Sequence, residues 1–256
     1  MNQFGSYLDA GLALGVTLAA VMALVLLFLR RVASHGLDGE QQRLLANKYG
    51  LFNSLYTFFL TLAVVTLLSG YNQSKTAVHQ EAERLLFLHR ASAELYGSGQ
   101  FRQTLELYTQ SIVKDEWPIL AEKRPSEATE SLSRLLWEGM RAMAPKDYKE
   151  AAIYQEMVRE LSEAQRGRIA RTLFARGHLF PLIWVVIGLG FVLCFVQFFH
   201  TSLPQRGAQA AYDFVVLSML AMVIMVLYSL DHPFQGLARI PPTSFEHVLE
   251  VMRRAP

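Results

Sequence analysis

Charge is distributed unevenly along this chain of 256 residues, and that distribution limits what it can fold into. Residues 71–177 carry 31 of the 46 charged side chains, whereas the other 149 residues carry only 15. Outside this block lie four long stretches with little or no charge: residues 10–29, 50–71, 179–199 and 214–230, the last extending back to 210. A helix needs about 20 mostly apolar residues to cross the hydrocarbon core of a bilayer. The pattern therefore predicts an integral membrane protein with four transmembrane helices.

A very apolar soluble bundle is the competing interpretation of these stretches. It is disfavoured because buried helices of soluble proteins are usually shorter and keep a polar stripe. The first stretch is not expected to be a cleaved signal peptide, since Arg30 and Arg31 follow its apolar run instead of preceding it. With 52% hydrophobic residues, a net charge of +2 and one cysteine, the composition excludes a disordered chain, a strongly basic nucleic-acid binder and a disulfide-stapled module.

The charged block is also predicted to be helical, because its apolar residues recur at spacings of three and four. This pattern covers residues 81–90, 101–117, 127–143 and 148–175. Ser126 suits a helix N-cap, and Gly, Ser and Pro predict breaks at 97–99, 117–118, 125–126 and 144–145. Helices are expected to continue from the membrane into this block at 70–80 and 166–178. The predicted fold is thus an all-α membrane protein with a helical region between the second and third spans.

The expected organisation has four parts: residues 1–70 with the first two spans, 71–177 as a soluble helical region, 178–232 with the last two spans, and 233–256 as a C-terminal tail. Four crossings place both termini and the soluble region on one side. Near the membrane this side carries eight Lys and Arg against five on the other side, which favours a cytoplasmic soluble region. The 30–50 loop, taken alone, favours the opposite orientation.

The sequence contains no arrangement typical of an enzyme, a cofactor site or a metal site. Cys194 lies inside the third span and is interpreted as a small apolar filler. The seven histidines are scattered without metal-ligand spacing, and motifs for phosphate, dinucleotide or serine-hydrolase chemistry are missing. We therefore expect a protein that is not an enzyme and that uses no cofactor or metal.

The second span carries two rows of side chains at four-residue spacing. One row is polar, with Asn53, Thr57 and Thr61, and the other is apolar, with Leu51, Leu55, Phe59 and Ala63. In a channel, a polar row hydrates ions and a bulky apolar row forms a narrow neck that gates by dewetting. In an ordinary bundle, the same rows form interhelical hydrogen bonds and packing. Spacing alone favours the second interpretation.

Several short motifs, in order along four-fifths of the chain, resemble the bestrophin-like family of prokaryotic membrane proteins. They are Glu81-Ala82, Tyr108 followed by Asp115-Glu116-Trp117-Pro118, residues 163–168 (EAQRGR), Pro181 with Trp184, and residues 231–236 (DHPFQG) followed by Ile240-Pro241 and Phe245. Residues 59–66 with Asn72-Gln73 also resemble the pore helix of the bestrophin anion channels. That resemblance implies a neck of Leu51, Leu55 and Phe59, and an insertion in the match allows a shift of one residue, or about 100° on a helix.

The resemblance implies a homo-oligomeric ring, with a pentamer as the first expectation, that conducts chloride-like anions across a bacterial plasma membrane. Residues 237–240 contain no acid, so the calcium site of calcium-gated bestrophins is not expected. A non-conducting scaffold or sensor, whose soluble region docks a partner, is the alternative. A secondary transporter is disfavoured, because the sequence lacks the broken helices and buried charge pairs that such proteins usually show. Asp231, Pro233 and Phe234 are expected at the cytoplasmic mouth or in a structural corner, and Arg166, Arg168 and Arg171 in a basic vestibule or in contact with lipid headgroups.

Overall fold

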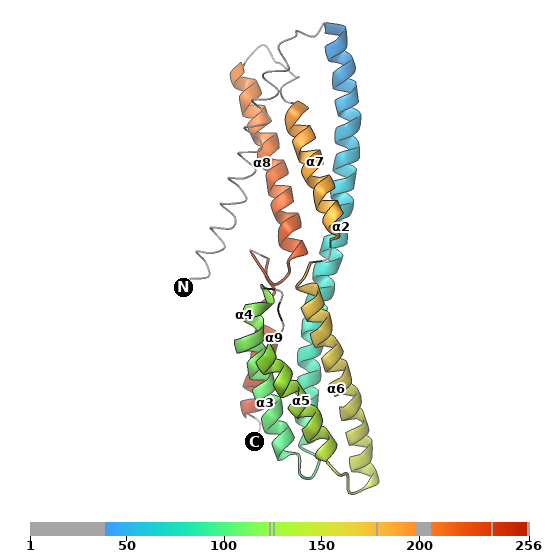
Figure 1. Ribbon diagram of the computed structural model, residues 1–256, viewed down its shortest axis with the longest axis vertical. Helices are drawn as coiled ribbons and strands as arrows, with labels where there is room; N and C mark the ends of the chain where they lie inside the picture. The colour runs from blue at the N-terminus through green and yellow to red at the C-terminus, as the bar shows by residue number, and fades with distance from the viewer. Residues whose placement is uncertain are drawn as a thin grey trace. The chain divides into compact units, whose positions relative to one another are not determined.

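The computed structural model describes residues 39–122, 124, 126–177, 179–197, 206–236 and 238–254 (Figure 1). Every regular element in these ranges is helical. In chain order they are α2 (Gly39–Ser92), α3 (Gly99–Ser111), a π-helix (Ile112–Glu116), α4 (Trp117–Leu120), α5 (Glu127–Ala142), α6 (Tyr148–Phe174), α7 (Pro181–Gln197), α8 (Arg206–Asp231) and α9 (Thr243–Arg254). The first predicted span, residues 10–29, lies outside the described residues.

The described residues divide into two compact units. The apolar unit comprises residues 39–67, 179–197 and 206–228, and the charged unit comprises residues 68–177 and 229–254. Helix α2 contributes its first part to the apolar unit and its second part to the charged unit. Its uninterrupted course confirms the expectation that a helix continues through residues 70–80.

Two helices of the described residues are long and apolar enough to cross a membrane: α2 from Asn47 onward and α8 from Ala211 to Asp231. Helix α7 is equally apolar in character but shorter, with 17 residues. Within the apolar unit, α7 contacts α2 through Ile187 and contacts α8 through Trp184, whose ring meets Tyr228 edge-on at 6.1 Å. These elements correspond to the second, third and fourth predicted spans.

Two expectations about helix continuity are wrong. Helix α6 ends at Phe174 and does not continue into α7, because Gly177 adopts a φ of +97° that other residues rarely take and Pro181 begins the next helix. Conversely, the chain does not break at Trp117-Pro118 but stays helical from Gly99 to Leu120. The π-helix changes the hydrogen-bond register of the backbone just before Pro118. Pro118 then lies in the first turn of α4, where a proline is tolerated because the backbone N–H that it lacks has no partner within the helix.

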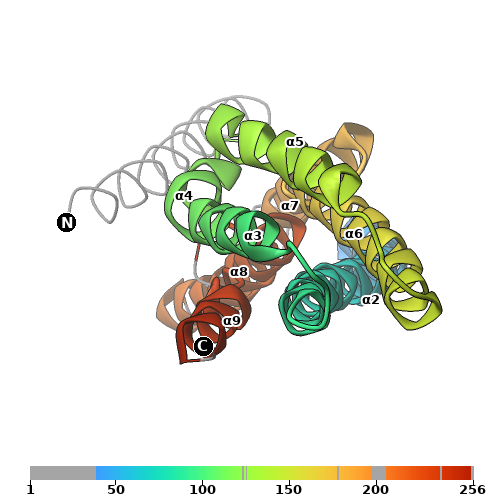
Figure 2. The ribbon, with the colours of Figure 1, turned by 90° about the horizontal axis from the view of Figure 1, so that it is seen from below.

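The core of the charged unit forms around α3, which lies between α5 and α9 (Figure 2). Fully buried side chains from α2, α3, α5, α6 and α9 meet there, among them Leu85, Phe101, Leu136, Leu161 and Phe245. Ser126 is the N-cap of α5, with its hydroxyl accepting from Thr129 N at 3.3 Å, which confirms the sequence prediction. Helix α9 lies in the segment predicted as a tail, where its Phe245, Val248 and Met252 are buried.

Candidate functional site

The predicted neck residues of α2 differ in their surroundings. Leu51 and Leu55 are exposed, at 66% and 62%, whereas Phe59 is half-buried and the next residue of the row, Ala63, is buried. A row at four-residue spacing drifts by about 40° per step around an α-helix of 3.6 residues per turn. The row therefore begins on the open side of α2 and winds toward its packed side.

The open side of α2 is an apolar stripe at alternating spacings of four and three. We define the outer stripe as Leu51, Leu55, Phe58, Leu62 and Val65, all of which are exposed. Within the described part of one protomer, these large side chains pack against no other helix closely enough to be buried. A continuous apolar stripe of this kind is typical of a surface that contacts lipid or another protein.

The packed side of α2 lies against α7. The Tyr56 hydroxyl donates to the main-chain oxygen of Ile187 at 2.7 Å, and the ring of Tyr56 lies over Gly190. Leu60, Ala63 and Leu67 continue this buried side along the helix. The apolar unit thus fixes one side of α2 and leaves the opposite side open.

The predicted polar row of α2 is exposed at Asn53, Thr57 and Thr61. Asn53 is close to α7, since the Cys194 thiol lies 3.7 Å from its Oδ1. The Thr61 hydroxyl instead donates to the main-chain oxygen of Thr57 at 2.9 Å, one turn back on the same helix. Of the two hydrogen bonds, only the one at Asn53 joins helices, as expected for a structural role.

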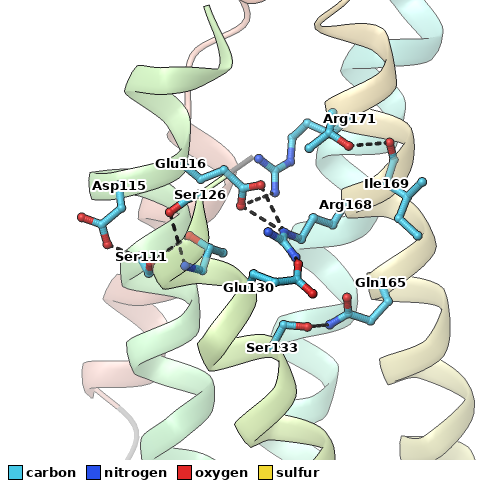
Figure 3. A network of polar contacts seen from close by, with 12 residues as sticks. Ser111, Asp115, Glu116, Ser126, Glu130, Ser133, Gln165, Arg168, Ile169 and Arg171 are labelled. Atoms are coloured by element: carbon cyan, nitrogen blue, oxygen red, sulfur yellow. Dashed lines mark hydrogen bonds and ion pairs between the residues drawn. The ribbon is translucent and has the colours of Figure 1, made fainter. Parts of the chain in front are cut away.

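A second candidate site is a network of buried charges in the charged unit (Figure 3). Arg171, which is completely buried, donates from Nε and Nη2 to the two carboxylate oxygens of Glu81 at 2.9 and 3.0 Å. Its Nη2 also lies 3.5 Å from Glu116 Oε2. Arg168 donates from Nε to both oxygens of Glu116, at 3.1 and 3.2 Å, and its Nη1 pairs with Glu130. Two guanidiniums are therefore neutralised by three carboxylates.

Local structure brings the members of this network together. Gly167 lets α6 approach α2, because a Cβ at that position would lie 3.1 Å from Glu81 Cβ. The π-helix carries Glu116 at its end, and π-turns re-aim the side chains next to them. The rings of Trp117 and Phe245 lie 5.4 and 5.5 Å from the guanidinium carbon of Arg171. Arg171 therefore contacts residues from α2, the π-helix, α4 and α9.

The electrostatics of the network are those of a structural ion-pair cluster. Burial raises the pKa of Glu81, and the guanidinium of Arg171 opposes that rise. Burial alone would lower the pKa of Arg171, but Glu81 and Glu116 raise it above its ordinary value, so it stays charged. Burial also raises the pKa of the nearby Tyr108 phenol, which keeps its proton. Because each guanidinium is paired with carboxylates, the network favours one arrangement of the helices within the charged unit.

The basic vestibule expected from the sequence has a different character in the structure. Arg166 is exposed and pairs with Glu163 at 2.6 Å. Arg168 and Arg171 are buried and ion-paired, so the expectation that these two form a solvent-facing basic patch is wrong. Sequence analysis missed Glu81 and Glu116 as their partners, because these acids lie 90 and 52 residues away in the chain.

The corner after α8 is tightly packed. Asp231 is buried beside Gly177, where a Cβ would lie 3.4 Å from its Oδ2, and His232 Nδ1 lies 3.8 Å from the same oxygen. Ile240 N donates to the Pro233 oxygen at 2.7 Å, which closes the loop. The Phe234 ring meets Trp117 edge-on at 5.5 Å. These contacts are those of a structural corner within the charged unit.

The described residues contain no group of three or more His, Cys, Asp or Glu side chains placed to hold a metal ion. In the described residues, an all-helical fold has two helices long and apolar enough to cross a membrane, and one of them leaves a bulky apolar stripe open, as is typical of helical membrane proteins. The model of the Bestrophin-like domain matches residues 16–245, and the chain belongs to the bestrophin-like family.

Solved structures of a bacterial bestrophin homolog from Klebsiella pneumoniae share this fold. A mutant form with one isoleucine replaced by threonine has a TM-score of 0.67 at 12% identity and covers 94% of this chain and 97% of its own. Two further mutant forms, a leucine-to-threonine and a tyrosine-to-alanine substitution, have TM-scores of 0.62 and 0.61 at 11% identity, each covering 95% of this chain and 96% of its own. No curated protein matches the chain in sequence.

Proposed function

We propose that this protein is an oligomeric ion channel of the plasma membrane that conducts chloride-like anions. The observation that carries the proposal is the two-sided character of α2: one side is seated on α7, and the other presents an open stripe of bulky apolar side chains. In the proposed ring, the edge of this stripe that continues from Leu51 and Leu55 to Phe59 faces the common axis, and Phe58 faces a neighbouring protomer or lipid. Large apolar side chains at the axis form a neck that excludes water when it is narrow.

The neck is proposed to consist of Leu51, Leu55 and Phe59. Leu51 and Leu55 belong to the outer stripe, and Phe59 stands at its edge. The neighbouring residue Phe58 lies within the stripe, about 100° away around the helix. These two phenylalanines have the same size and chemistry, so comparing them tests the proposed neck directly.

A homo-oligomer follows from this proposal, because one protomer has too few spanning helices to enclose a pore. A pentamer is the proposed state from the bestrophin resemblance, and the lipid bilayer is the remaining partner. Helix α8 suits contact with lipid, since Phe214, Val215, Met219 and Met222 are all exposed on it. The proposed topology keeps four spans, including residues 10–29, with both termini and the soluble region in the cytoplasm.

The proposed preference for anions rests on family membership. Of the three arginines that the sequence places in a basic vestibule, Arg168 and Arg171 are neutralised by carboxylates and Arg166 is paired on the surface. The charged unit therefore supplies little free positive charge at these positions. Asp231, Pro233 and Phe234 are proposed to stabilise the corner after α8 rather than to bind the ion.

Recording from purified protein in a planar bilayer tests the proposal. We expect currents whose reversal potential moves toward the chloride equilibrium potential when a chloride gradient is imposed. A protein that is silent in all salts, and after Phe59→Ala as well, contradicts conduction and supports a scaffold or sensor whose charged unit docks a partner. Reversal at the cation equilibrium potential contradicts the proposed ion.

A further inference from the structure

We infer that Tyr56 and Gly190 form a lock between α2 and α7 that fixes the rotation of α2 about its own axis. The inference rests on the proposed function, because it matters for conduction only if α2 lines the pore. It assigns to these two residues the role of positioning residues: they do not touch the ion, but they decide which side chains of α2 face it.

The first component of the lock is steric. A Cβ added at Gly190 would lie 2.1 Å from Cε2 of Tyr56 and 2.5 Å from Cδ2. Carbon atoms in contact are normally separated by about 3.5–4.0 Å, so no residue with a side chain fits here while the ring stays in place. Gly190 is thus a notch in α7 that receives the ring of Tyr56 and sets the distance between the two helices.

The second component is directional. The Tyr56 hydroxyl donates to the main-chain oxygen of Ile187, which lies three residues before Gly190 on α7. Both Tyr56 and Ile187 are buried. A ring held in a notch at one end and hydrogen-bonded at its other end cannot swing around the helix axis, because the swing would break the bond and bring the ring against the α7 backbone. Inside an apolar environment a lost hydrogen bond of this kind is not replaced by water.

The third component lies one turn away on both helices. Cys194, four residues after Gly190, brings its thiol to 3.7 Å from the side-chain oxygen of Asn53, three residues before Tyr56. Contact at these two levels defines a seam between antiparallel helices. A seam with two contact levels resists tilting as well as rotation.

The lock is close to the proposed neck. Tyr56 directly follows Leu55 and precedes Phe59 by three residues, so all of them belong to adjacent turns of one helix. A rotation of α2 by about 100° would bring Phe58 to the direction in which Phe59 points and would turn Phe59 away from it. The contact of Tyr56 with Gly190 therefore determines which phenylalanine is presented to the pore.

Helix α7 contains a matched control for this inference. Gly188 lies two residues before Gly190, in the same helix, and a Cβ added there would have nothing within 4 Å. Gly188→Ala and Gly190→Ala change helix propensity in the same direction. Only Gly190→Ala fills the notch. Any difference between the two variants therefore reports on the contact with Tyr56.

The test measures the accessibility of α2 positions by cysteine modification in proteoliposomes, in a Cys194→Ser background, because the serine hydroxyl keeps a donor for Asn53 Oδ1. With glycine at 190 we expect a charged, water-soluble thiol reagent to modify Phe59→Cys at least fivefold faster than Phe58→Cys. Gly188→Ala should keep this ratio, and Gly190→Ala should lower it at least fivefold, with a parallel change in unitary conductance. Tyr56→Phe, which keeps the ring and removes the hydroxyl, should lower the ratio less than Gly190→Ala and serves if the latter fails to assemble.

The two possible failures are distinguishable. If the unsubstituted protein conducts and Gly190→Ala matches Gly188→Ala in both ratio and conductance, the lock is overturned and the channel proposal stands. If Tyr56→Phe is used because Gly190→Ala does not assemble, an unchanged ratio overturns the lock in the same way. If the unsubstituted protein carries no current and neither cysteine reacts, the proposed function is overturned, and the inference with it.

Discussion

Arg171 and Glu81, ninety residues apart in the chain, form a bidentate ion pair in which both side chains are completely buried. Glu116 Oε2 lies 3.5 Å from Nη2 of the same guanidinium, and the rings of Trp117 and Phe245 lie close to it. An ion pair of this kind gives little net stability over an apolar packing, but breaking it leaves an uncompensated charge. The pair therefore specifies how the helices of the charged unit fit together.

Removing one partner of this pair should be costly. We expect Glu81→Gln to reduce the free energy of unfolding of the charged unit by about 3 kcal/mol or more, because Arg171 then keeps its charge with only the longer contact to Glu116. Glu163→Gln breaks the exposed pair with Arg166 and should cost less than about 1 kcal/mol. Thermal unfolding in detergent, followed by tryptophan fluorescence, compares them. Equal melting temperatures for the two variants would contradict this account.

The close approach of α6 to α2 makes a prediction about two helical glycines. Gly139→Ala should stabilise the protein by about 0.5–1 kcal/mol, since its Cβ would meet Phe101 at an ordinary 3.7 Å and alanine favours the helix. Gly167→Ala gains the same helix propensity, but its Cβ would lie 3.1 Å from Glu81 Cβ. We expect it to be less stable than Gly139→Ala. A higher melting temperature for Gly167→Ala than for Gly139→Ala would show that the two helices separate without penalty.

His89 predicts a pH dependence of the charged unit. Burial, and then the nearby guanidinium of Arg102, lower the pKa of this histidine below its ordinary value of 6.5. The unfolded chain then binds a proton more readily than the folded one, so stability is fully present above about pH 6.5 and falls as the pH drops below it. We expect His89→Gln to flatten the melting temperature between pH 7.5 and about pH 5. His247→Gln, at an exposed histidine, should keep the dependence of the unsubstituted protein.

Sequence periodicity predicted the helical regions well because each helix here has a regular apolar side. The same periodicity also indicates the charge network, because charged residues stand on the apolar sides of two helices. Glu81 stands in register with Val78 and Leu85, and Arg168 and Arg171 stand in register with Leu161. A charge on the apolar side of a helix must find a partner when it is buried. Which partner it finds depends on tertiary packing, and neither spacing nor composition encodes that.

The breaks between helices were harder to predict, for a local reason. Pro118 predicts a break, yet the chain stays helical there because a π-helix precedes it. The apolar spacing predicts a helix that continues past Phe174, yet this helix ends close to Gly177, which has a positive φ. The sequence also does not predict the rotation of α2 about its own axis. Spacing placed Leu51, Leu55 and Phe59 in one row, but the contact of Tyr56 with Gly190 decides how far that row turns away from solvent.

The proposed ring predicts the appearance of the purified particle. Class averages from electron microscopy of the protein in detergent should show rotational symmetry around a central hole, with five copies as the expected number. The reason is geometric, because the outer stripe of one protomer needs equivalent stripes to enclose a pore. A monomer, or a dimer packed without a hole, would favour the scaffold or sensor instead.

The central claim, that α2 lines a conducting pore with Phe59 at its neck, is tested most directly by unitary conductance in a planar bilayer. Phe59→Ala removes a ring from the proposed constriction and should raise chloride conductance several-fold, as expected when a hydrophobic gate widens and stays hydrated. Phe58→Ala removes the same ring from the adjacent position and should leave conductance within about twofold of the unsubstituted protein. A conductance that Phe59→Ala leaves unchanged while Phe58→Ala raises it would contradict the assigned neck, and silence of all three proteins would contradict the channel.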